Sequence, residues 1–212
     1  MTNRHRIYTY ICAAICSLLL PATAKAQLKG VQLSYDVAGT VMRMVSDYGQ
    51  YEGALQANFS NRYFPIAEIG YGSSEHETDP VTGIFAKANA PYFKLGCDFN
   101  IAKNKDDAYR IFVGARYAFT KFDFETSAIA EDPVWKNTTP YSITENGLSY
   151  HWAELVFRVD AKVWGPLHLG WSTRYKLKIH GKGSEHGDLW YIPGFGKQGN
   201  KIGATFNVGI EL

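Results

Sequence analysis

Residues 168–180, with the sequence HLGWSTRYKLKIH, alternate between two kinds of side chain. The odd-numbered positions are mostly large and apolar, such as Leu169 and Trp171, whereas the even-numbered positions include Arg174 and Lys176. Successive side chains of an extended strand point to opposite faces, so the segment predicts a β-strand with one apolar and one charged face. A soluble barrel would bury the apolar face, and a membrane barrel would turn that face to lipid.

Similar alternation occurs in eight segments of the chain and predicts eight strands. No long segment has a helical stripe, and after the N-terminal region no apolar run is long enough, at about 18 residues, to predict a membrane-spanning helix. We therefore predict an all-β fold, an eight-stranded antiparallel up-and-down transmembrane β-barrel. The predicted strands are 31–43, 51–60, 65–73, 91–101, 108–120, 148–163, 167–180 and 202–212.

The connections between these strands alternate in length. Those after the second, fourth and sixth strands are short, as in the Trp164–Pro166 turn, whereas long polar connections cover 74–90, 121–147 and 181–201. Short turns on one side and long loops on the other are typical of outer-membrane barrels, whose turns lie in the periplasm. With an even number of strands, both chain ends are expected on the periplasmic side.

The N-terminal segment predicts export. Arg4 and Arg6 precede an apolar stretch, and an Ala-Lys-Ala sequence ending at Ala26 resembles a cleavage site. We therefore expect 1–26 to be a signal peptide and 27–212 to be a single outer-membrane barrel domain. The chain has 22 basic and 20 acidic residues; three of the basic ones lie in the signal, so the mature chain has 19 against 20, a net charge of −1. This balance, without any recognisable motif, argues against nucleic acid as a partner.

The charged face of the predicted strands has the composition of a crowded interior. Glycines such as Gly96, Gly114 and Gly170 fall on it, and a glycine within a strand marks a close approach of another group. Acidic and basic residues share this face in near-equal numbers, as a dry lumen requires, because unpaired buried charges are very costly. We predict a non-conducting lumen filled by a structural ion-pair network, whose members are Glu68, Asp98, Arg110, Arg116, Glu154, Arg158, Asp160, Lys162, Arg174 and Lys176.

Two groups of loop residues resemble the components of a catalytic site. The first is Ser74, Glu75 and His76; the second is His180, Ser184, Glu185, His186 and Asp188. A general base must lie within hydrogen-bond reach of a nucleophile or water, and spacing within loops does not establish that geometry. The sequence therefore predicts no catalytic residue, metal site or cofactor. A lipid-modifying enzyme and a periplasmic lipocalin-like carrier remain as alternatives to a structural or interaction protein.

Four stretches carry a family resemblance: APYFKLGCDFN, FVGARYAF, YIPGFGK and the long segment from His151 to Lys178. Together they resemble an uncharacterised family of small outer-membrane barrels of Gram-negative bacteria, classed as a domain of unknown function and similar to the eight-stranded porin-like superfamily. The resemblance implies an outer-membrane location and contact with lipid. It implies no activity. The three long polar loops are the expected site for contact with an extracellular ligand or protein.

Overall fold

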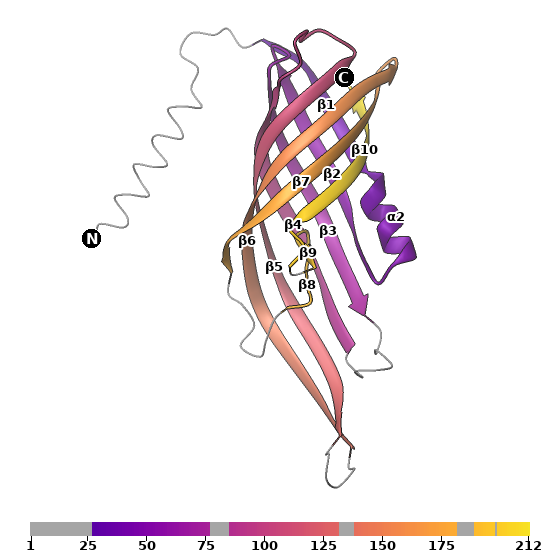
Figure 1. The fold of residues 1–212 in the computed structure, drawn as a ribbon, viewed down its shortest axis with the longest axis vertical. Helices are drawn as coiled ribbons and strands as arrows, with labels where there is room; N and C mark the ends of the chain where they lie inside the picture. The colour runs from indigo at the N-terminus through magenta and orange to yellow at the C-terminus, as the bar shows by residue number, and fades with distance from the viewer. Residues whose placement is uncertain (1–26, 77–84, 132–137, 182–188, 198) are drawn as a thin grey trace, which may run out of the picture.

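The computed structural model describes residues 27–76, 85–131, 138–181, 189–197 and 199–212. It contains a closed barrel of eight strands in the spatial order β1-β10-β7-β6-β5-β4-β3-β2, with every neighbouring pair antiparallel (Figure 1). The predicted all-β, eight-stranded antiparallel barrel is confirmed. Among the described residues, no helix is both long and apolar enough to cross a membrane. The barrel strands are β1 (Leu28–Asp36), β2 (Tyr48–Phe59), β3 (Tyr63–His76), β4 (Phe85–Asn100), β5 (Tyr109–Glu131), β6 (Thr138–Trp164), β7 (Leu167–Gly181) and β10 (Ile202–Glu211).

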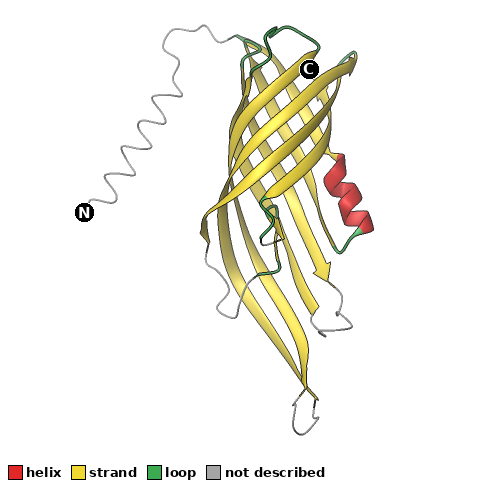
Figure 2. Ribbon diagram, viewed as in Figure 1, coloured by secondary structure: helices red, strands yellow, loops and turns green. Residues whose placement is uncertain are grey.

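The first predicted strand, 31–43, is wrong in its second half. The strand ends at Asp36, and α2 (Val37–Val45) follows it as a helix on the outside of the barrel (Figure 2). The Asp36 carboxylate accepts a hydrogen bond from the Ala38 backbone N–H at 3.1 Å, which caps the first turn of the helix. A nine-residue helix is marginal alone, so packing against β2 and β10 stabilises it.

The first two predicted long loops are shorter than expected. Both 74–90 and 121–147 contain strand at their ends, and β5 and β6 run far beyond the other strands as a hairpin (Figure 1). In this outer part the polarity of the alternation is reversed, because Lys121 and Asp123 are exposed while Phe122 and Phe124 are buried. The sequence still has period two there, but with its apolar face inward.

Within the third predicted loop, 181–201, the described residues 189–197 enter the mouth of the barrel. Its described part contains a small hairpin of β8 (Tyr191–Ile192) and β9 (Gly196–Lys197), and residues 191–195 are buried. Tyr191 donates a hydrogen bond to the Gly49 carbonyl at 3.1 Å, and burial raises the pKa of the Tyr191 phenol, so the phenol stays a neutral donor. We call residues 189–197 the plug.

The two faces of the barrel strands have opposite character. Inward positions carry most of the buried charged side chains, among them Lys94, Asp98 and Glu154. Outward positions are apolar and exposed, as at Leu155, which is 56% exposed. This arrangement is the reverse of a soluble barrel, in which apolar side chains fill the interior.

Candidate functional site

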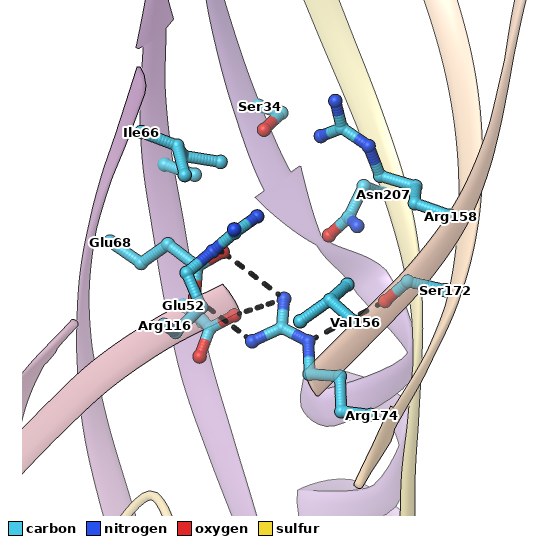
Figure 3. Close-up of a pocket in the computed structure, with 11 residues that line it drawn as sticks. Ser34, Glu52, Ile66, Glu68, Arg116, Val156, Arg158, Ser172, Arg174 and Asn207 are labelled. Carbon is cyan, nitrogen blue, oxygen red and sulfur yellow. Dashed lines mark hydrogen bonds and ion pairs between the residues drawn. The ribbon is translucent and has the colours of Figure 1, made fainter. Parts of the chain in front are cut away.

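The centre of the barrel is occupied by a layer of ion pairs, which we call the charged layer. Its side chains are no more than 5% exposed and come from β2, β3, β4, β5, β6 and β7 (Figure 3 shows five of them). Among the described residues, the layer contains four carboxylates and four cations, so its formal charges balance. The carboxylates are those of Glu52, Glu68, Asp98 and Glu154, and the cations are Lys94, Arg116, Arg158 and Arg174.

Lys94 and Arg174 hold three of the carboxylates together. Lys94 Nζ lies 2.7 Å from Glu52 Oε2 and 3.4 Å from Glu154 Oε1. The Arg174 guanidinium lies 2.9 Å from Glu68 Oε2, 3.0 Å from Glu52 Oε1 and 3.4 Å from Glu154 Oε2. Each cation thus contacts several acids, and the short distances with charge-assisted hydrogen bonds offset the cost of removing these ions from water.

Arg116 connects this group to the fourth carboxylate. Its Nε lies 3.2 Å from Glu68 Oε1, and its Nη1 lies 2.6 Å from Asp98 Oδ1. Arg158 contacts Asp98 Oδ2 at 3.4 Å, and both side chains also bond to the Gln56 amide. Strands far apart in the sequence therefore join in one continuous network across the lumen.

Aromatic side chains close the charged layer on both sides. Towards the plug, Tyr92 and Trp152 donate hydrogen bonds to Glu52 and Glu154 at 2.8 and 2.7 Å, and Phe195 of the plug packs edge-on against Trp152. On the other side, Phe64 and Phe112 pack edge-to-face at 4.8 Å, and the Arg158 guanidinium lies over the Phe112 ring.

The charged layer leaves almost no empty space. A void of about 10 Å³ lies between Glu52, Glu68, Arg116, Arg158 and Arg174 (Figure 3). A single water molecule needs about 10–15 Å³ of such space. The void between these side chains is therefore no larger than about one water molecule.

A second, smaller ion cluster lies nearer the chain ends. His168 Nδ1 lies 2.7 Å from Asp160 Oδ2, and His168 Nε2 lies 3.1 Å from Glu211 Oε2. Arg110 donates two hydrogen bonds to the Glu211 carboxylate, at 3.1 and 2.9 Å. Because Glu211 is the last residue of β10 and Arg110 lies at the start of β5, this cluster joins two strands that are not neighbours in the barrel.

The structure brings most of the predicted lumen residues together, with two exceptions. Lys162 is exposed near the β6–β7 turn. Lys176 is buried but donates to the backbone carbonyls of Gly194 and Phe195, at 3.2 and 2.7 Å, rather than to an acid. The predicted set omitted Glu52, Lys94 and His168, although all three fall on the inward face of the alternation and could have been included on that signal.

The loop residues with catalytic potential do not form a site among the described residues. Ser74 is buried on the inward face of β3, whereas Glu75 points outward and pairs with Lys87 at 3.1 Å. His76 ends β3, and His180 is exposed on β7. Ser184, Glu185, His186 and Asp188 lie outside the described residues, as does the expected signal peptide at 1–26. No group of acidic, histidine and cysteine residues suited to a metal ion occurs in the described part of the chain.

These features define a small β-barrel whose interior is filled by paired charges. Residues 14–211 match the family described as Domain of unknown function (DUF6048), and the chain belongs to this family. The expected membership of an uncharacterised family is thereby confirmed. No curated protein and no solved structure matches the chain.

Proposed function

We propose that the protein is an integral outer-membrane barrel that acts as a rigid, non-conducting anchor for an interaction surface at its outer end. The distribution of polarity around the barrel carries the proposal. Apolar side chains cover the outward face of its strands, including Leu55, Leu95, Leu155 and Trp171, and burying such a surface in lipid removes its contact with water.

The outward apolar side chains form a band around the barrel, and a row of aromatic rings marks the outer edge of this band. Phe93, Phe119, His151 and His180 are register partners on β4, β5, β6 and β7, and neighbouring rings lie 5.5 to 6.4 Å apart. Just beyond this row the outward positions become charged, as at Lys121. Aromatic side chains at such a transition are typical of the interface between membrane and water.

The height of the apolar band fits a bilayer. On β5 the outward positions from Tyr109 to Phe119 are all exposed, and every one is apolar or aromatic. These eleven residues compare with the about 9–11 residues that a tilted strand needs to cross a membrane. At the opposite end, Tyr109 and Trp164 are exposed next to the short turns, where a second aromatic girdle is expected.

The proposed role follows from what the interior and the outer end provide. Within the described chain, the charged layer and the plug fill the centre of the lumen with charged and aromatic side chains, which supports a non-conducting barrel rather than a lipocalin-like carrier with a central apolar cavity. The β5–β6 hairpin extends beyond the other strands (Figure 2), and its outward residues Lys121, Asp123 and Glu125 are polar. A stiff extension on a closed barrel suits contact with an extracellular ligand or protein.

Two measurements on the full chain test this proposal. Cell-envelope fractionation should recover the protein in the outer membrane. On SDS gels, the unboiled protein should migrate differently from the boiled protein because a closed barrel resists detergent. Recovery in the soluble periplasmic extract without a mobility shift would overturn the proposal and favour a soluble protein.

A further inference from the structure

The barrel wall has a gap beside β1. In this short strand only Gln32–Asp36 pair with β10, where they lie opposite Asn207–Glu211. Beyond that level, 202–206 of β10 pair with β7 alone and 48–52 of β2 pair with β3 alone. These two stretches of the described chain would both be neighbours of a longer β1, so the wall lacks a strand between them.

Helix α2 covers this gap from outside. It contacts both β2 and β10 (Figure 1). Glycines allow its close approach to β2, because a Cβ at Gly49 would lie 2.5 Å from the Arg43 backbone. On the side away from the barrel, Met44 and Val45 are 75% and 78% exposed, so the helix presents an apolar surface at the level of the wall. Such a surface is suited to the lipid interface.

A cavity of about 370 Å³ lies behind the helix and passes through the gap. Its outer part is lined by Met42, Ile202 and Ala204, and the side chain of Ile202 is exposed on the outside of the barrel. Its inner part is lined by Lys176 and by Phe195 of the plug, both of which are buried. The volume lies within the range of small-molecule sites, about 300–1,000 Å³.

Lys176 gives the inner end of this cavity a positive charge. It is 8% exposed, and it forms no ion pair with any carboxylate in the described part of the chain. Within the described chain its ammonium is held by the two plug carbonyls in a desolvated place, and the four acids of the neighbouring charged layer already contact other cations. Buried cations are normally paired, and an anionic group at this position would add a charged partner to the two carbonyls. Gly203, at the edge of the gap, leaves space for the lysine stem: a Cβ there would lie 3.2 Å from Lys176 Cε.

We propose that this cavity binds a single-chain fatty acid that enters from the membrane through the gap beneath α2. The carboxylate pairs with Lys176, and the hydrocarbon chain lies between Met42, Ile202 and Ala204 and continues towards the lipid. The inference rests on the proposed membrane location, because the fatty acid reaches the gap from the bilayer. The inference assigns a class of ligand to the protein, and α2 covers the lateral entrance to the binding cavity.

The test uses the full barrel in phosphatidylcholine vesicles and a palmitate analogue that carries a diazirine. After irradiation, mass spectrometry should locate saturable cross-links at α2, the start of β10 and the plug. Ala204→Trp, which fills the outer part of the cavity, should weaken palmitate binding at least about tenfold. Ala115→Trp is the matched control, because Ala115 is also an outward alanine but lies on β5, away from the gap. It should bind as the wild type does.

A second pair of variants tests the charge. Lys176→Met should abolish the preference for palmitate over palmityl alcohol, whereas Lys178→Met, at an exposed lysine on the same strand, should retain it. Cross-links spread evenly over the outward strands, or equal binding by both tryptophan variants, would overturn the inference. All preparations are also checked for the unboiled SDS mobility shift. A normal shift without binding rejects the fatty-acid site alone, whereas a wild-type protein without a shift and outside the membrane rejects the proposed function.

Discussion

Replacing Arg174 by methionine tests whether the charged layer stabilises the barrel. Arg174 is nearly inaccessible to solvent and lies 2.9, 3.0 and 3.4 Å from Glu68, Glu52 and Glu154. Its removal changes a layer of four acids and four bases into one with an excess negative charge. Removing one partner of a buried ion pair costs about 3–5 kcal/mol, so Arg174→Met should lower the free energy of unfolding by that amount.

Urea unfolding of the barrel in vesicles, followed by tryptophan fluorescence and by the unboiled SDS mobility, measures this loss. A second variant shows whether charge or packing causes it. Adding Glu68→Gln to Arg174→Met restores neutrality and should recover part of the loss, with a coupling of about 0.5–3 kcal/mol between the two sites. If Arg174→Met stays within about 0.5 kcal/mol of the wild type, or if the two changes are additive, the charged layer is not the stabilising element described above.

Three further predictions concern the outer surface, the packing of the lumen and its conductance. Leu155→Arg on the outward face should destabilise the barrel in vesicles by about 2–4 kcal/mol, whereas Val163→Arg near the strand end should cost about 0–1 kcal/mol. Urea titration measures both losses, and equal losses would contradict a bilayer centred on Leu155. Gly114→Ala should cost about 1–3 kcal/mol because the new Cβ would overlap Asp98 Oδ1, whereas Gly53→Ala should be tolerated, its nearest neighbour being 3.9 Å away. The same urea titration distinguishes them, and equal stability would refute the crowded lumen. In planar bilayers the protein should show no single-channel current, and a steady conductance would mean that the charged layer opens.

The sequence predicted the barrel because the alternation of side chains is strongest where the two faces meet the most different surroundings. Leu155 and Trp171 face outward and Glu154 and Arg174 face inward, so period two identifies both the strands and their inner face. The long hairpin was missed because beyond Phe119 the outer surface is polar and the apolar side chains turn inward. The expectation of an apolar outer face does not hold there.

The helix and the plug depend on contacts that no local pattern contains. Residues 37–45 include Val37 and Val41, which suit a strand, and their helix forms through the Asp36 cap and the packing of Gly49 against Arg43. The plug is buried because Lys176 and Tyr191 bond to distant backbone carbonyls. Which acid pairs with which base also depends on side-chain reach across the lumen. No local pattern indicated that Lys176 would bond to plug carbonyls rather than to an acid within the described chain.

The long sequence separations within the charged layer have a consequence for how the barrel is assembled. Arg174 pairs with Glu52, and Arg110 pairs with Glu211, so each partner arrives from a distant part of the chain. For the proposed outer-membrane barrel, a partly inserted sheet would expose these unpaired charges to hydrocarbon, which is costly. Under that proposal we expect hairpins to gather at the membrane surface and to cross together as the ring closes, with β1 meeting β10 last. Assembly of this kind is slow and cooperative, since loop closure comes before the stabilising contacts form.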